Sequence, residues 1–142
     1  MPAQTKISKT LINAYYTAHY RVKGPPAFTL RIRKKSPELA KLYETYQVTS
    51  AMYITAYNPY GKKTDRNTNM RNHKRLLGEL TRQGLTCMEG VGGDPSGHWV
   101  AEPSLLVLGV TQDFAREKAV EYRQNAVVWA DSDAVPELIL TR

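Results

Sequence analysis

The chain contains 142 residues, of which 42% are hydrophobic and 23% are charged. These values are typical of a soluble globular protein, and we expect residues 1–142 to form a single domain. No apolar run is long enough to span a bilayer, and the N-terminus lacks the apolar core of a secretory signal, so we expect a cytoplasmic protein with no membrane partner. The single cysteine, Cys87, cannot form an internal disulfide.

The formal net charge is +7, and the positive charge is concentrated in two segments. Residues 1–35 contain eight Lys or Arg and no acidic residue, and residues 61–82 contain seven basic and two acidic residues. Residues 83–142, in contrast, contain four basic and nine acidic residues. Such a positive field favours an anionic partner, although a solvated basic face explains the same pattern.

The first 48 residues are predicted to form a helix, a hairpin and a second helix. Ser8 is a candidate N-cap for a helix that ends near His19. Two short strands with a turn at Gly24-Pro25-Pro26 are expected within residues 21–33, where basic and apolar residues alternate. Ser36-Pro37 then begins a helix whose buried stripe is predicted to be Leu39, Leu42, Tyr43 and Tyr46.

Residues 49–142 are predicted to alternate between strands and helices. An apolar strand over residues 50–58, covered on both faces, precedes a helix from about Asp65 to Gln83. Strands are expected over residues 85–91 and 99–108, with an edge or bulge at Pro103 because proline cannot donate to a sheet ladder. A helix over residues 112–122 and strands over residues 125–129 and 136–141 complete the chain. The inward stripe of the long helix is predicted to be Met70, His73, Leu77 and Leu80.

From Ala51 onward the expected order is strand, helix, strand, strand, helix, strand. This order is that of the split βαβ arrangement of ferredoxin-like sheets. We therefore predict an α+β fold in which residues 49–142 form a ferredoxin-like βαββαβ half and residues 1–48 form an N-terminal helix–hairpin–helix addition. A homodimer formed through sheet edges is compatible with this fold.

Several motifs of this chain occur together in one known family. They are residues 12–20, residues 50–59, Asn67 on the predicted long helix, residues 99–109, and residues 124–129. With these motifs the chain resembles, over nearly its whole length, the bacterial family catalogued as domain of unknown function 3293. The resemblance implies no substrate, cofactor or mechanism, and the pair Lys62-Lys63 is a feature of this chain and not of the family.

Polar residues at the ends of predicted strands are the main candidates for a ligand site. Amide, carboxylate and hydroxyl groups that converge at one sheet edge would form a polar pocket for a small ligand. The same residues can instead stabilise turns and satisfy backbone groups. The candidate ligand-binding residues are Asn58, Lys62, Lys63, Thr64, Asn67, Glu102, Ser104, Gln124 and Asn125.

The loop over residues 58–64 lies between a predicted strand and a helix N-terminus, where N–H groups attract anions. It does not complete a Walker phosphate loop, because Ala56 stands where the first glycine is needed and Lys63 stands where the hydroxyl residue is needed. We therefore predict a nonspecific anion site, although a mobile, solvated loop explains the same residues. The corresponding function is a small binding or regulatory protein for an anionic ligand, such as a nucleotide or a phosphorylated metabolite.

Catalytic and metal-binding patterns are weak, and no catalytic residue is assigned. Cys87 and His98 could face each other across a hairpin as nucleophile and base, but a lone cysteine in a strand is more often a buried hydrophobe. His73 on an apolar stripe favours a packing role. The histidines and the cysteine lack metal-ligand spacing, so we predict no metal and no cofactor. A small enzyme that uses the Asn, Glu, Ser and Gln groups of the pocket is one alternative.

A nucleic-acid-binding module is the other alternative. The basic residues would bind phosphates, and tyrosines of the apolar strand could stack on bases. Against this hypothesis, core packing explains the tyrosines and no RNA-recognition signature is present. The candidate nucleic-acid contacts are Arg31, Arg33, Lys34, Lys35, Arg66, Arg71, Lys74 and Arg75.

Overall fold

The computed structural model describes residues 5–95 and 101–142. These residues form one mixed α/β fold with a single antiparallel sheet in the strand order β2-β1-β4-β5-β3-β6-β7. The elements are α1 (Lys9–Thr17), β1 (His19–Val22), β2 (Phe28–Leu30), α2 (Pro37–Tyr46), β3 (Ala51–Ile54), the 3₁₀ turn η1 (Pro59–Gly61), α3 (Arg66–Arg82), β4 (Cys87–Gly93), β5 (Glu102–Leu108), α4 (Gln112–Glu121), β6 (Ala126–Ala130) and β7 (Pro136–Leu140).

The first 48 residues extend this sheet. β1 pairs with β4 as well as with β2, so the N-terminal strands continue the sheet formed by the later part of the chain. The predicted order of strands and helices from Ala51 onward is present as β3, α3, β4, β5, α4 and β6. The predicted strand residues 99 and 100 lie outside the described residues.

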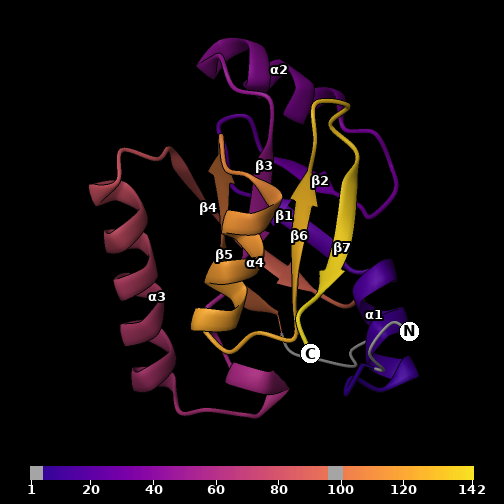
Figure 1. Ribbon diagram of the computed structural model, residues 1–142, viewed down its shortest axis with the longest axis vertical. Coiled ribbons are helices and arrows are strands. Elements are labelled where there is room, and N and C mark those ends of the chain that lie inside the picture. The colour runs from indigo at the N-terminus through magenta and orange to yellow at the C-terminus, as the bar shows by residue number, and fades with distance from the viewer. Residues whose placement is uncertain (1–4, 96–100) are drawn as a thin grey trace.

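The sheet curls until the chain beyond β2 meets the chain before β7. The amide of Arg33 donates to the carbonyl of Pro136 at 2.7 Å, and the amide of Ser36 donates to the carbonyl of Ala134 at 3.0 Å. The sheet consequently has a concave and a convex face. Figure 1 shows α2 at one end of the strands and α1 near the other end, with α3 and α4 beside the sheet.

Each face of the sheet carries its own hydrophobic cluster. In β3, Ala51 and Tyr53 belong to the concave cluster, whereas Met52 and Ile54 belong to the convex cluster. The expected burial on both faces is therefore confirmed for Ala51–Ile54, but the strand ends there and does not extend to residue 58. The concave cluster includes Leu39, Leu42 and Tyr43 of α2, and the convex cluster includes Leu76 and Leu80 of α3 and Ala115 and Ala119 of α4.

Polar caps begin the helices. The side chain of Ser8 accepts a hydrogen bond from the amide of Leu11, and Ser36 accepts from Leu39, as expected for N-cap residues. Asp65 and Thr111 cap α3 and α4 in the same way. None of the helices within the described residues is long and apolar enough to cross a membrane.

Two predicted helix stripes need correction. Tyr46, expected to be buried on α2, is 44% exposed, and Met70, expected to be buried on α3, is 37% exposed. The fully buried positions of α3 are Asn69, Leu76 and Leu80. Because the buried face of α3 begins with a polar residue, a search for apolar periodicity places this face one residue away from its true position.

Pro103 lies in an interior strand, at a point where that strand has only one neighbour. β5 pairs with β4 on one side, where Val91 faces Pro103. On the other side the register with β3 ends at the pair Ile54 and Leu105. The Thr55 hydroxyl donates to the carbonyl of Pro103 at 2.8 Å. The sheet therefore opens between β3 and β5 at this end, and polar side chains occupy the opening.

Candidate functional site

A cavity of about 640 Å³ lies on the concave face of the sheet, next to α1. Leu11 and Tyr15 of α1 line it, together with residues of β1, β3, β5, β6 and β7 and of the segment between β3 and α3. Tyr20, Tyr53 and Val128 belong both to the concave hydrophobic cluster and to the cavity wall. The cavity thus continues the concave core, and its volume lies in the range of pockets that bind small molecules.

Small residues in β4 and β5 leave this space in the core. Along β5 the concave positions change from Leu108 and Leu106 to Ser104 and Glu102, and the adjacent strand presents Gly90 and Gly92. A Cβ at position 90 would lie 2.2 Å from the carbonyl oxygen of Arg21 and 2.8 Å from the Tyr53 hydroxyl. Gly90 therefore allows the Tyr53 ring to lie against β4, where its hydroxyl donates to the carbonyl of Arg21 at 2.7 Å.

An asparagine network fixes the polar side of the cavity. The backbone amide of Asn58 donates to Oδ1 of Asn69 at 2.9 Å, and Nδ2 of Asn69 donates to Oδ1 of Asn58 at 3.0 Å. The amide of Thr64 also donates to Oδ1 of Asn58, at 2.9 Å. Asn58 adopts the left-handed conformation, φ 48°, which Asn tolerates better than most residues. Since its Oδ1 accepts two hydrogen bonds, the Nδ2 of Asn58 must point in the other direction, toward Glu102.

Glu102 presents a carboxyl group to the cavity. Nδ2 of Asn58 donates to its Oε2 at 2.7 Å. Among the described residues, Glu102 forms no ion pair with Lys, Arg or His. Burial raises the pKa of Glu102 to about 7, and the hydrogen bond from Asn58 opposes this rise only in part. The carboxyl group therefore changes charge near neutral pH.

Gln124 adds a second acceptor to the polar side of the cavity. Its Nε2 donates to the carbonyls of Tyr57, at 3.2 Å, and Tyr122, at 3.1 Å. Within the described residues no donor contacts the Oε1 of Gln124 or the Oε1 of Glu102. Both side chains line the cavity. Its polar side thus offers hydrogen-bond acceptors.

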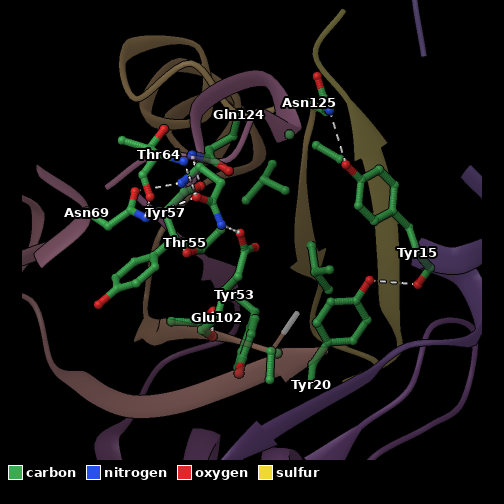
Figure 2. A pocket seen from close by; sticks show the side chains of 18 of the residues that line it. Tyr15, Tyr20, Tyr53, Thr55, Tyr57, Thr64, Asn69, Glu102, Gln124 and Asn125 are labelled. Atoms are coloured by element: carbon green, nitrogen blue, oxygen red, sulfur yellow. Dashed lines mark hydrogen bonds between the residues drawn. The ribbon is translucent and has the colours of Figure 1, made fainter. Parts of the chain in front are cut away.

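Tyrosine side chains form the wall opposite the asparagine network. Figure 2 shows Tyr15 and Tyr20 on one side of the cavity and Thr64, Asn69 and Glu102 on the other. The Tyr20 hydroxyl donates to the carbonyl of Tyr15 at 2.6 Å, and Nδ2 of Asn125 donates to the Tyr15 hydroxyl at 3.2 Å. Tyr20 and Tyr53 pack edge to face with ring centroids 5.4 Å apart. Burial raises the pKa of each of these tyrosines, so they are neutral hydrogen-bonding groups.

Charged residues lie where the cavity meets solvent. Lys63, Asp65 and Arg66 are exposed and line the cavity. The Asp65 side chain accepts from the amide of Thr68 at 3.0 Å, and this contact holds the pKa of its carboxyl below the usual value. Lys63 and Arg66 thus place two cationic side chains at the opening, where an anionic group can approach from solvent.

The structure brings most of the predicted ligand-binding residues together. Lys62 and Asn67 are exposed and do not line the cavity. The Ser104 hydroxyl donates to the carbonyl of Glu102 at 3.0 Å. This local contact satisfies a backbone group, which is the alternative role considered for these polar residues. The predicted residues that line the cavity are Asn58, Lys63, Thr64, Glu102, Ser104, Gln124 and Asn125.

Several lining residues escaped sequence reasoning. Asn69 lies two positions after the predicted Asn67 on the same helix. The rotation of α3 about its axis decides which of the two asparagines faces the cavity. Tyr15, Tyr20 and Tyr53 carry an ordinary core pattern, so their sequence gives no signal of a cavity. The sequence feature that indicates a cavity is the row of small and polar residues in β4 and β5.

The basic residues proposed for nucleic-acid binding fall into two groups. Arg33 stacks on Tyr16 of α1, with 4.6 Å between the guanidinium carbon and the ring centroid, and its amide contacts Pro136 of β7. Figure 1 shows α1 and β7 on the opposite side of the molecule from α3. The first group is Arg31, Arg33, Lys34 and Lys35, which follow β2, and the second is Arg66, Arg71, Lys74 and Arg75 on α3.

Within residues 5–95 and 101–142, the remaining chemistry-bearing side chains form no second site. Burial raises the pKa of the Cys87 thiol to about 11, which disfavours the nucleophilic thiolate, and His98 lies outside the described residues. Nε2 of His73 lies 3.1 Å from Oε2 of Glu89, outside the cavity lining. In the part of the chain that the structure describes, no group of His, Cys, Asp and Glu could hold a metal ion.

The fold and site define a mixed α/β protein with a ligand-sized cavity on the concave face of its sheet. A family model described as "Protein of unknown function (DUF3293)" matches residues 54–127, just over half of the chain, and the chain belongs to this family. The matched segment contains Asn58, Asn69 and Glu102, but it begins after Tyr15 and Tyr20. No curated protein and no solved structure matches the chain.

Proposed function

We propose that this protein binds a small ligand in the cavity and that an anionic part of the ligand lies against Lys63 and Arg66. The observation that carries this proposal is the cavity itself, which combines a tyrosine wall with a few converging polar groups. Lys63 and Arg66 at the opening support the anionic part, because exposed cations attract anions from solution. Nucleotides and phosphorylated metabolites have both an anionic part and a body of suitable size.

The architecture supports placing the site within a ferredoxin-like half. The strands β4, β5, β3 and β6 are neighbours in that order and pair antiparallel, and their chain order is the split βαβ order. We infer that residues 49–142 form this half and that the whole chain acts as one domain, since β1 completes the cavity from the N-terminal part.

The test is a thermal-shift screen of purified protein against nucleotides and phosphorylated small molecules at low and high salt. The neighbouring residues Lys62 and Lys63 provide a matched pair, because both are exposed lysines and only Lys63 lines the cavity. Lys63→Ala is expected to reduce the shift caused by an anionic ligand, and Lys62→Ala is expected to leave it unchanged. Ala126→Leu, which adds volume to the cavity wall, is expected to reduce the shift for every ligand.

Two outcomes would overturn the proposal. The first is the absence of any ligand whose stabilisation depends on Ala126. The second is stabilisation by RNA or DNA alone that both lysine variants weaken equally and that falls steeply with salt, because this pattern indicates phosphate contacts on an open surface.

A second candidate function is acid–base catalysis in the same cavity, and the near-neutral pKa of Glu102 favours it. A general base is most effective when its pKa lies near the working pH. If a ligand from the screen is recovered chemically unchanged after prolonged incubation with the protein, this candidate is rejected for that ligand and binding alone remains.

A further inference from the structure

We propose that the group of the ligand that enters the cavity deepest is a cationic nitrogen, an ammonium or a guanidinium, which pairs with the carboxylate of Glu102. This inference rests on the proposed function, because it assigns the inner end of a ligand whose outer end is anionic. The complete ligand is then two-ended, with a cation at Glu102 and an anion at Lys63 and Arg66.

The fixed polarity of the asparagine network is the first argument. Asn69 and Thr64 both donate to Oδ1 of Asn58, so Asn58 can offer only its Nδ2 to Glu102. Asn58 therefore acts as a donor to one carboxylate oxygen, Oε2. It supports the ionised form of Glu102 and leaves Oε1 to accept from the cavity side.

The lack of a protein counter-charge is the second argument. A buried carboxylate in proteins is ordinarily paired with a cation or strongly hydrogen-bonded. Among the described residues, none of the Lys, Arg or His side chains forms an ion pair with Glu102. A cationic ligand would supply this charge, and a neutral or anionic group at the same position would leave the carboxylate without it.

The remaining walls also suit a cation. Gln124 offers its Oε1 as a second acceptor. Tyr15, Tyr20 and Tyr53 line the same cavity, and a positively charged nitrogen is attracted to the face of an aromatic ring. Burial is the main cause of the raised pKa of Tyr15, and the charge of Glu102 adds to this rise.

The test uses three probes that share a phenyl ring and a two-carbon arm: phenethylammonium, 2-phenylethanol and 3-phenylpropionate. Affinity is measured for each by NMR titration of the full chain. Phenethylammonium is expected to bind at least tenfold more tightly than the other two probes, and its signals are expected to shift residues of the cavity wall.

Glu102→Gln is the decisive variant. Because Asn58 must donate to residue 102, a glutamine there would turn its carbonyl toward Asn58 and its NH₂ group toward the cavity. The variant is expected to lose the preference for phenethylammonium completely. Glu89→Gln is the matched control, since Glu89 is an acidic residue that does not line the cavity, and it is expected to retain the preference.

The pH dependence gives an independent measurement that does not require a variant. The carboxyl group must lose its proton to pair with the cation, so the affinity for phenethylammonium should fall about tenfold for each pH unit below about 7. Among the described residues, the other ionisable side chains that line the cavity are Tyr57, the three tyrosines Tyr15, Tyr20 and Tyr53, whose pKa values are raised away from neutrality, and Lys63, Asp65 and Arg66 at the opening. Asp94 does not line the cavity but acts electrostatically on Tyr20. The affinity for 2-phenylethanol should not follow this dependence.

The outcomes distinguish the two proposals. Binding of the alcohol or the carboxylate probe as tightly as the ammonium, or an unchanged preference in Glu102→Gln, overturns the cation assignment and leaves the cavity as a binding site. If none of the probes shows saturable binding at tens of millimolar, and no ligand of the earlier screen depends on Ala126, both the cation assignment and the proposed function are rejected.

Discussion

Asn69 determines how the other polar residues of the cavity are oriented. Its side chain exchanges two hydrogen bonds with Asn58 and donates a third to the carbonyl of Thr64 at 3.1 Å. It is only 4% exposed, so water cannot replace these contacts when they are lost.

We predict that Asn69→Ala lowers the free energy of unfolding by about 2 kcal/mol, because it leaves polar groups of Asn58 and Thr64 without partners. Urea denaturation measures this loss. Asn67→Ala, two positions earlier on the exposed side of α3, is the control and should change stability by less than about 0.5 kcal/mol. Equal losses in the two variants would contradict the network as described.

Glu102 is expected to make stability depend on pH. Its pKa in the folded protein is about 7, above the ordinary value of 4.5, so ionisation costs the folded state more than the unfolded state. Its contribution is therefore most favourable below about pH 4.5 and is lost as the pH rises toward 7. In the absence of ligand, Glu102→Gln should match the wild type at low pH and be more stable by about 3 kcal/mol at pH 8, because one pKa unit corresponds to about 1.4 kcal/mol.

Chemical denaturation across this pH range checks the prediction. Glu89→Gln serves again as the control, because Glu89 lies outside the cavity and pairs with His73. A difference between Glu102→Gln and the wild type that stays constant with pH would contradict the raised pKa.

Asn67 and Asn69 illustrate a limit of prediction from sequence, since the local pattern does not show which residue of a helix faces the cavity. Position 67 was predicted as a site residue, and the structure places position 69 in the cavity wall. Both asparagines lie on the same helix, so choosing between them requires the rotation of α3 to within one residue. Glu102, Gln124 and Asn125 were easier to find, because a polar residue at the end of an apolar strand stands out without any knowledge of helix rotation.

The rotation of α3 also determines which of its apolar residues stabilise the fold. Leu80 is fully buried in the convex cluster, whereas Met70 is 37% exposed. We predict that Leu80→Ala lowers the free energy of unfolding by about 3 kcal/mol and that Met70→Ala lowers it by less than about 1 kcal/mol. Thermal or urea denaturation of both variants measures the difference. Similar losses would indicate that Met70 is buried, as the apolar periodicity of the helix predicts.

The types of the elements were more predictable from sequence than their arrangement. Ser8, Ser36 and Asp65 are N-caps with a local physical reason to begin helices, and the alternation in β3 is visible in its residues. The pairing of β1 with β4 depends on contacts between residues about 70 positions apart, such as Arg21 and Val91. No local pattern encodes such a pairing, so the sequence predicts the N-terminal hairpin only as an addition and does not indicate which strand it joins.

At the scale of the whole molecule, the curl of the sheet creates the cavity. A flat sheet would expose Tyr20 and Tyr53, which belong to strands that are not neighbours, and it would give the ligand no enclosing wall. The contacts of Arg33 with Pro136 and of Ser36 with Ala134 join the two sides of the curl. They connect parts of the chain about a hundred residues apart.

These two contacts give the curl a measurable signature in amide hydrogen exchange. The amides of Arg33 and Ser36 lie outside any strand, yet they can exchange only when the two sides of the curl separate. We predict that both exchange much more slowly than the amide of Lys35, an exposed neighbour in the same segment. Exchange followed by NMR measures this directly. If the sides of the curl open independently of the core, the amides of Arg33 and Ser36 will exchange as fast as that of Lys35. If opening requires general unfolding, the protection of these two amides will approach that of the interior strands β3 and β5. In that case the cavity exists only in the fully folded molecule.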